Sequence, residues 1–395
     1  MKDIKKDLIF NTLSNFLQFG TRWFFNISLA RKLDSVSYGK FTLLYSVANL
    51  FSSLFAFGSN LFLLHKAQEN ASVLIRSLLL TISIFVTVLI IILILFPKYL
   101  VMLLLAFSLA LNINLFSYYK GIGWFDKEAR LYLLFSVALL IIILLISKGF
   151  VPSVNSLMLI LTGINFAVFL VGLLYVGFSF NCKLNMKTNF FFLVKNELIE
   201  RFTYGVHEFL SILFKNLEFI LLSIYAGNKY LGEYRAIYNL VFPFYTIATI
   251  TSQVLLSRLS NSTKDKRKLL LRKFTILTGS VGVFLFIILY GTYPFVSQIF
   301  YDSRFTDIIY KFTYLLMLAN LLVYLIKSNF EVTLTATGKQ AFRVKVLSLS
   351  IFLLIITDFF FIKVGGILGH SLAILIVNTF IFFVYLRKTL MLEAK

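Results

Sequence analysis

The feature that most constrains this chain is a series of roughly twelve apolar stretches, each close to the 20 or so residues that a helix needs to cross a bilayer. Hydrophobic residues make up 59% of the chain and charged residues 14%, against about 45–50% and 25% in soluble domains. We expect membrane spans at about 8–30, 40–64, 77–96, 100–119, 131–147, 154–179, 203–226, 234–257, 274–299, 312–330, 342–362 and 365–386.

The apolar runs favour helices over a membrane β-barrel. Residues 77–96 read SLLLTISIFVTVLIIILILF without a break, whereas barrel strands are short and alternate in hydrophobicity. The predicted fold class is therefore an all-α polytopic membrane protein with about twelve transmembrane helices. The N-terminal segment lacks a compact apolar core followed by a small-residue cleavage site, so we interpret it as retained.

The net charge of +21 is distributed as in a membrane protein and does not indicate nucleic-acid binding. With a cytoplasmic N-terminus, the expected cytoplasmic segments hold 25 Lys and Arg residues and the external loops hold 10. This asymmetry follows the positive-inside rule and predicts that both termini are cytoplasmic. The dense basic run at 257–273 is interpreted as a topology determinant that contacts anionic lipid, with a specific polyanion site as the alternative.

Signals for catalysis or metal binding are poor. A single cysteine, Cys182, allows no internal disulfide or thiolate cluster. The sequence TLTATGKQ at 333–340 lacks the first glycine and the final Ser or Thr of a P-loop. No metalloprotease, CxxC or serine-triad pattern is present, so we expect a protein that is not an enzyme and that has no cofactor.

An internal repeat relates residue n to residue n+193. Gly39 aligns with Gly232, and Arg22 aligns with Lys215 in the same gap-free register. The offset is close to half of the chain, so we predict two pseudo-symmetric six-helix lobes at 1–200 and 201–395. Internal repeats with a site at their interface are typical of transporters.

Polar residues gather on one face of several expected spans. In the first span a stripe within about 80° of arc holds Asn11, Asn15, Gln18, Arg22 and Asn26. The seventh span repeats this with His207, Ser211, Lys215 and Glu218, with Glu208 at the edge. In the tenth span the shared face holds Asn320, Tyr324, Lys327 and Glu331, and Asp358 lies in the eleventh.

These stripes predict a hydrated cavity lined by cations. A charged residue at mid-bilayer costs about 2.5–3.5 kcal/mol on insertion scales and therefore faces a bundle interior or water. Arg22 and Lys215 would attract an anion, and arginine suits phosphate because its planar fork is permanently charged. The candidate binding residues are Arg22, Lys215, Asn11, Asn15, Gln18, Asn26 and Ser211, and the ion-coupling candidates are Glu218, Glu208, His207, Lys327, Glu331 and Asp358.

Structural roles remain open for the same residues. Arg22 and Lys215 could form internal ion pairs, and Glu218 lies at salt-bridge spacing from Lys215. Lys327, Glu331 and Asp358 lie close enough to span ends to reach the interface with water. His207 and His370 could equally be packed histidines.

Three stretches resemble the polysaccharide repeat-unit (O-antigen or capsule, Wzx-type) flippases of the multidrug/oligosaccharidyl-lipid/polysaccharide (MOP) exporter superfamily. Residues 29–41, LARKLDSVSYGKF, resemble the Leu-Ala-Arg end of that family's first helix and the Tyr-Gly-x-Phe start of its second. Residues 223–240 and 365–379 resemble its entry to helix eight and a late glycine-rich helix. The Gly-Pro often found in the first loop is absent here, and Lys215, Asn216 and Glu218 stand where many relatives have an aspartate.

The resemblance implies a two-lobed, MATE/MOP-like transporter that works by alternating access. Its substrate would be an undecaprenyl-diphosphate-linked oligosaccharide, moved from the cytoplasmic to the outer leaflet of the bacterial inner membrane and driven by a proton or sodium gradient. Membrane lipids, a polysaccharide polymerase and a chain-length regulator would be its partners.

Three alternative functions compete with that of a flippase. A multidrug exporter of the same superfamily often takes cationic substrates, which a positive cavity disfavours. A membrane polymerase or ligase would carry a large external loop, whereas the longest expected loop here, 180–202, is cytoplasmic. A structural scaffold would leave the polar stripes unexplained.

Overall fold

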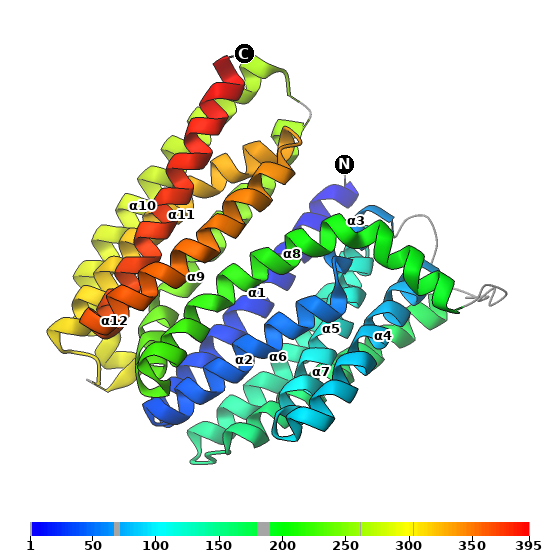
Figure 1. Ribbon diagram of the computed structural model, residues 1–395, viewed down its shortest axis with the longest axis horizontal. Helices are drawn as coiled ribbons and strands as arrows, with labels where there is room; N and C mark the ends of the chain where they lie inside the picture. Colours follow the sequence, from blue (N-terminus) through cyan, green and yellow to red (C-terminus); the bar gives the residue numbers. More distant parts are fainter. Residues whose placement is uncertain (1, 67–71, 180–189, 261, 303, 395) are drawn as a thin grey trace. The chain divides into compact units, whose positions relative to one another are not determined.

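A computed structural model describes residues 2–66, 72–179, 190–260, 262–302 and 304–394, and in these ranges the regular structure is helical throughout (Figure 1). The elements are α1 (Lys2–Lys32), α2 (Ser35–Ala56), α3 (Ser59–Lys66), α4 (Ser72–Leu95), η1 (Pro97–Tyr99), α5 (Leu100–Gly121), α6 (Phe125–Ser147), α7 (Val154–Ser179), α8 (Phe190–Ala226), α9 (Asn228–Ser260), α10 (Lys264–Tyr301), α11 (Ile308–Ala336) and α12 (Gln340–Ala394). The predicted all-α fold class is confirmed.

Each expected span corresponds to helix, with two refinements at glycines. The span at 40–64 is divided into α2 and α3, because Phe57 and Gly58 have φ of 28° and 75°. The last two spans form two helices, labelled together as α12, which are separated by the non-helical residue Gly366 with φ 52° and ψ −125°. A Cβ on Gly369 would overlap the carbonyl oxygen of Phe361, so the two halves of α12 turn back tightly.

The expected loop at 180–202 is wrong over its second half. Residues 180–189, with Cys182, lie outside the described residues, but α8 already begins at Phe190. Charged residues in 195–201 suggested a loop, and the structure instead buries Glu197 and Arg201 within the helix bundle. Hydropathy alone does not distinguish an exposed charge from one that is paired inside a fold.

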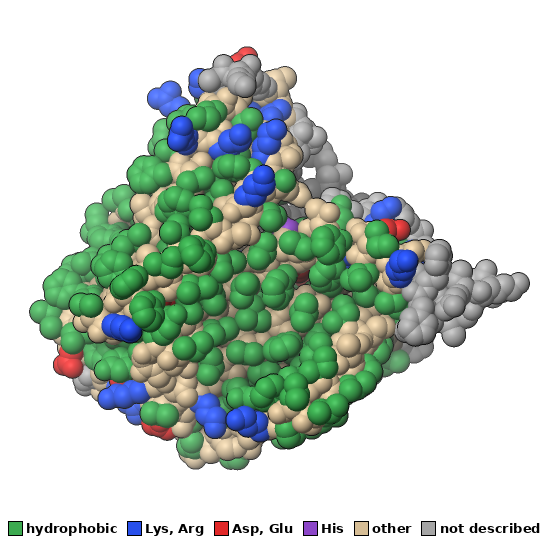
Figure 2. Space-filling model, in the orientation of Figure 1, with side chains coloured by type: hydrophobic (Ala, Val, Ile, Leu, Met, Phe, Trp, Pro, Cys, Tyr) green, Lys and Arg blue, Asp and Glu red, His purple; other side chains and the backbone are tan. Residues whose placement is uncertain are grey.

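The surface of the helices is that of a multi-pass membrane protein. In the described ranges, nine helices are long and apolar enough to cross a membrane. Large apolar side chains point outward, and Phe16 is 74% exposed and Val364 91%. Figure 2 shows hydrophobic side chains over much of the visible face. α1 and α2 are not among the nine, and α1 is the helix that carries the polar stripe with Arg22.

The chain forms two compact units. The first contains residues 1–28 and 43–216, and the second contains residues 29–42 and 217–395. These limits differ from the predicted lobes, 1–200 and 201–395, because most of α8 belongs to the first unit and the α1–α2 turn belongs to the second. Lys215, expected to represent the second lobe, therefore lies in the first unit together with Arg22.

Polar side chains join the helices of the first unit, where α5 packs against α3, α4, α6 and α7. The Asn112 side-chain amide donates to the backbone and side-chain oxygens of Asn165 at 2.9 and 3.1 Å. Asn114 donates to Thr81 Oγ1 at 3.0 Å and accepts from Ser77. Such interhelical bonds replace the hydrophobic driving force that helices lack in lipid.

In the second unit α11 packs against α9, α10 and α12, and the α1–α2 turn meets the start of α9. A Cβ on Gly39 would overlap the carbonyl oxygen of Asn228, and a Cβ on Gly232 would overlap the carbonyl oxygen of Ser35. These two contacts are related by the internal repeat, because Gly232 lies 193 positions after Gly39 and Asn228 lies 193 positions after Ser35. The two copies of the repeat thus meet backbone to backbone, and glycine is required on both sides.

Candidate functional site

Arg22 lies in the middle of α1, half-buried in the first unit. Its guanidinium lies over the ring of Phe135 at 5.1 Å. Its Nε is buried without a hydrogen-bond partner, and the described part of the chain gives Arg22 no carboxylate.

The other predicted binding residues lie in α1 and α8 of the first unit. Asn26 donates its side-chain amide to the carbonyl of Arg22 at 2.8 Å, and Ser211 donates to the carbonyl of His207 at 2.8 Å. Both side chains keep an oxygen that can accept a hydrogen bond. Gln18 is half-buried and Lys215 is exposed. Asn11 and Asn15 lie in α1, and their side chains are outside the described part.

A second intramembrane arginine, Arg201 of α8, was not singled out from the sequence. Its side chain is 0% exposed. Nη1 donates to the hydroxyls of Ser59 at 2.9 Å and Ser77 at 2.8 Å, and Nη2 pairs with Glu197. The guanidinium also lies over the Phe62 ring at 4.3 Å. Arg201 thus has an ion pair and two hydroxyl acceptors, although its Nε, like that of Arg22, is buried without an acceptor.

Two of the ion-coupling candidates lie one to two turns beyond Arg201 on α8. Glu208 is 9% exposed, and its Oε2 is buried without a hydrogen-bond partner. His207 is half-buried. Both belong to the first unit, whereas the candidates on α11 and α12 belong to the second.

The candidates on α11 both contact α12 inside the second unit, and Glu331 keeps 30% of its side chain exposed. Lys327 is 5% exposed and donates to Asn378 Oδ1 at 2.6 Å. Glu331 forms an ion pair with Arg343 of α12, which also donates to Thr335 Oγ1 at 2.6 Å. Lys327 and Glu331 thus tie α11 to the two halves of α12.

Asp358 and His370 form a pair that the sequence did not connect. Asp358 Oδ1 lies 2.9 Å from His370 Nδ1, and both side chains are 0% exposed. The expectation that Asp358 reaches outward to water is therefore wrong. In a straight helix, twelve residues would separate them by about 18 Å, so the contact exists because α12 folds back at Gly366.

An aromatic face with one cation lies on α9 of the second unit. The guanidinium of Arg235 lies 4.7 Å from the ring centre of Phe219, 5.0 Å from that of Tyr238 and 5.8 Å from that of Phe242. Tyr238 stacks on Tyr245 at 5.9 Å. Four of these residues, at 235, 238, 242 and 245, have helical spacing. This spacing can be seen in the sequence, but it does not stand out because most of the surrounding residues are also apolar.

Ion pairs and hydrogen bonds fix the α1–α2 turn within the second unit. Arg31 forms a bidentate pair with Asp302 at 2.7 and 3.0 Å, and Tyr38 accepts from Asn239 at 2.8 Å. Asp34 caps α2 by accepting from the amides of Val36 and Ser37. The side-chain hydrogen bond from Ser37, followed by these amides, lowers the pKa of the Asp34 carboxyl.

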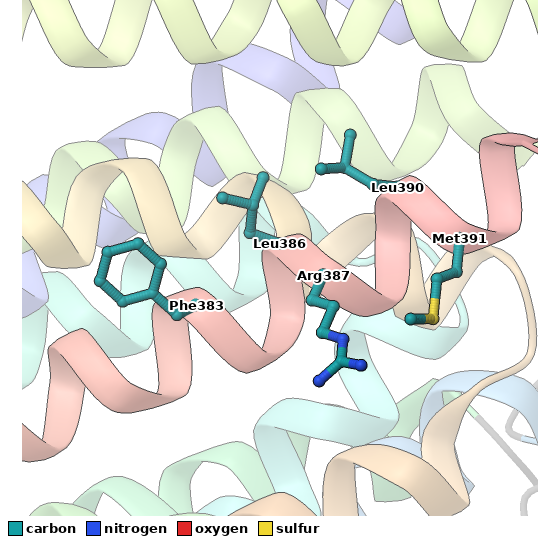
Figure 3. Close-up of a pocket in the computed structure, with 5 residues that line it drawn as sticks. All are labelled: Phe383, Leu386, Arg387, Leu390 and Met391. Carbon is teal, nitrogen blue, oxygen red and sulfur yellow. The ribbon is translucent and has the colours of Figure 1, made fainter.

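A shallow groove of about 530 Å³ runs along the C-terminal end of α12. Figure 3 shows Arg387 as the single charged side chain among four apolar ones: Phe383, Leu386, Leu390 and Met391. The groove contains none of the predicted site residues. Its lining matches the apolar, lipid-facing surface around it.

Solved structures share the fold. The lipid II flippase MurJ in an inward closed conformation matches with a TM-score of 0.72 and 17% identity, over 96% of this chain and 87% of that chain. An inward-facing multidrug resistance MATE family transporter of the MOP superfamily matches at 0.67 and 14%, over 97% and 94%. A MOP superfamily transporter from Pyrococcus furiosus matches at 0.66 and 15%, over 100% and 96%.

The sequence comparisons point the same way. No curated protein matches the chain. A family model described as polysaccharide biosynthesis protein matches residues 4–263, more than half of the chain. The chain therefore belongs to the polysaccharide biosynthesis protein family and has the two-unit, all-helical fold of MOP-superfamily transporters.

Proposed function

We propose that this protein is a flippase that moves a lipid-diphosphate-linked oligosaccharide from the cytoplasmic to the outer leaflet of a bacterial cytoplasmic membrane. Family membership supports a role in polysaccharide biosynthesis. The excess of Lys and Arg in the expected cytoplasmic segments supports cytoplasmic termini. Polysaccharide polymerase and chain-length regulator proteins would act on the product.

The observation that carries the proposal is the uncompensated charge of Arg22. A cation within the membrane-spanning part is costly unless it is paired or hydrated, and in the described chain Arg22 has an aromatic ring beside it but no carboxylate. A diphosphate supplies the missing negative charge and accepts the paired N–H donors of a guanidinium. An organic cation would be repelled.

The remaining groups suit a sugar. Asn26, Gln18 and Ser211 offer side-chain oxygens to hydroxyl groups. In the proposed cycle, the diphosphate binds Arg22 from the cytoplasmic side. The protein then changes from an inward-facing to an outward-facing conformation, and the headgroup is released on the outer side.

The test is leaflet exchange in liposomes that contain the purified protein. The probe is a fluorescent short-chain polyprenyl-diphosphate disaccharide, and external reductant quenches the label in the outer leaflet only. We expect rapid exchange by the native protein, slow exchange by Arg22→Ala and intermediate exchange by Arg22→Lys. Arg130→Ala, an exposed arginine of the first unit, serves as the matched control.

Two results would contradict the proposal. Exchange by Arg22→Ala at the native rate would remove the assigned site. Transport of a lipophilic organic cation, together with no exchange of the diphosphate probe, would favour a multidrug exporter instead.

A further inference from the structure

We propose that the groove along the C-terminal end of α12 holds one anionic diacyl phospholipid, with an acyl chain against the apolar side chains and the phosphate on Arg387. The inference does not depend on the proposed function, because the occupant is a lipid of the surrounding membrane and not the transported molecule. It gives a role to the groove of Figure 3, which contains none of the predicted site residues.

The apolar part of the groove is one face of a helix. The lining positions, 383, 386, 387, 390 and 391, follow the three- and four-residue spacing of such a face. The face is about 12 Å long, and the groove of about 530 Å³ lies within the roughly 300–1,000 Å³ of ligand sites. Phe383 is 60% exposed, Leu390 55% and Met391 48%. An acyl chain along this face would cover apolar surface that the fold leaves open.

Arg387 brings a positive charge to this apolar face. Its side chain is exposed, and among the described residues no carboxylate lies within ion-pair distance of its guanidinium. The next residue, Lys388, lies over the ring of Phe342 at 5.3 Å. A phosphate accepts the parallel N–H donors of a guanidinium. A phospholipid places its phosphate at the boundary between acyl chains and water, where a membrane-spanning helix such as α12 ends.

The charge at this end of the second unit favours an anionic headgroup over a zwitterionic one. Successive helices alternate in direction and α11 packs against α9, α10 and α12, so the α9–α10 connection lies at the same end as the C-terminus. Figure 2 shows Lys and Arg side chains at the top of the view, near the end at which Figure 1 marks the C-terminus. Exposed cations at this connection are Arg258, Lys266, Lys268, Arg272 and Lys273.

Few acids offset these cations. In the sequence 257–273, Asp265 is the only acidic residue. Glu331, near the same end of α11, already forms an ion pair with Arg343. Lys and Arg close to a membrane surface attract anionic lipid, so the basic surface raises the local concentration of the headgroup that Arg387 binds.

A second copy of the chain fits the groove less well than a lipid. In a two-fold dimer the same surface meets itself, which would bring the two Arg387 side chains together. A stable interface also buries about 800 Å² per partner, from about 20–30 residues, whereas five residues line this groove. The transported lipid fits less well too, because its diphosphate would leave one phosphate without a cation in the groove.

The experiment measures lipid binding to the purified full chain by native mass spectrometry. Dioleoyl phosphatidylglycerol is the anionic probe and dioleoyl phosphatidylcholine the zwitterionic one, so the acyl chains are identical and the headgroups differ. Arg387→Gln removes the charge and Arg387→Lys keeps it. Arg272→Gln, at an exposed arginine of α10, is the matched control. The melting temperature of each protein is measured without lipid and with each lipid.

We expect the native protein to bind a first phosphatidylglycerol about tenfold more tightly than phosphatidylcholine, the effect of one charged hydrogen bond. Arg387→Gln should lose this preference, Arg387→Lys should keep part of it, and Arg272→Gln should bind as the native protein does. Without lipid, Arg387→Gln should melt as the native protein does, because the side chain is exposed. Phosphatidylglycerol should raise the melting temperature of the native protein and not that of Arg387→Gln.

A further variant tests the apolar part of the groove. Leu390→Gln places a polar side chain where the acyl chain would lie, so it should weaken the binding of both lipids by a similar factor and leave their ratio unchanged. Native binding of both lipids by Leu390→Gln would show that the acyl chain lies elsewhere and would overturn the inference.

Two other results would overturn it. Equal losses of headgroup preference in Arg387→Gln and Arg272→Gln would show a diffuse attraction to the whole basic surface and no site. A polyprenyl diphosphate added at equal concentration should leave the bound phosphatidylglycerol in place. Displacement of that lipid from the native protein would assign the groove to the transported molecule instead.

Discussion

Two arginines of the first unit show how differently a buried cation can be accommodated. Arg201 has an ion pair with Glu197, two hydroxyl acceptors and an aromatic ring around it. Arg22 has an aromatic ring beside it and, in the described chain, no carboxylate. In both arginines Nε is buried without an acceptor, so the contrast lies in the ion pair and the hydroxyl acceptors. Both stand in helices among apolar residues, so the intramembrane charge alone does not identify a site. The missing counter-charge supports the proposal that Arg22 binds an anionic ligand.

The largest expected effect is the loss of Arg201. Arg201→Ala leaves the buried Glu197 without its principal partner, and breaking a buried ion pair costs about 3–5 kcal/mol. Thermal unfolding in detergent should show a large fall in melting temperature. A fall in melting temperature no larger than that of Arg130→Ala would mean that Arg201 does not stabilise the fold.

Replacing both partners sharpens this test. In Arg201→Met with Glu197→Met, neither charge of the buried pair remains, and apolar replacement of a whole buried pair is often neutral or stabilising by about 1–4 kcal/mol. We expect the double variant to recover most of the stability that Arg201→Ala loses. A double variant as unstable as the single one would show that the hydroxyl contacts of Ser59 and Ser77 carry the stability instead. Arg76, 3.9 Å from Glu197, is left in place.

Asp34 provides an exposed group for comparison. Removing a helix N-cap by Asp34→Ala costs about 0.5–2 kcal/mol. The folded pKa of Asp34 is lowered by its bonds to Ser37 and Val36, so its ionised form contributes stability above the unfolded pKa. That contribution is lost as the pH falls through the lowered folded value. Melting curves of native protein and Asp34→Asn should therefore converge in acid, and a constant difference at all pH values would contradict the cap.

The smallest expected effect on stability is at Arg22. Arg22→Met removes a charge that no carboxylate offsets, so the melting temperature should stay close to that of the native protein or rise. A fall comparable to that of Arg201→Ala would reveal a structural partner and would end the contrast between the two arginines.

Much of the fold could be predicted because each helix that crosses a bilayer needs an apolar run as long as the bilayer is thick. The apolar runs and the offset of 193 were sufficient for the helices and the repeat, and Gly39 and Gly232 indeed meet. The start of α8 was missed because Arg201 pairs with Glu197 and donates to Ser59 and Ser77, and the two serines lie 142 and 124 residues away. No local pattern encodes such partners.

The candidate site was predictable only in part. Helical periodicity places Arg22, Gln18 and Asn26 on one stripe, but it does not reveal which cation lacks a counter-charge. The Asp358–His370 pair depends on the fold-back of α12 at Gly366, which turns a separation along the sequence into a contact. Periodicity assumes a continuous helix and therefore cannot join residues across a turn.

The most direct test of the central claim is the binding of a soluble diphosphate-sugar probe to detergent-purified protein by isothermal titration calorimetry. A hydrogen-bonded charge contributes about 1.5–3 kcal/mol, so Arg22→Met should bind roughly tenfold to a hundredfold more weakly, while Arg130→Ala binds as the native protein does. Arg22→Met that keeps native affinity and a native melting curve would contradict the account.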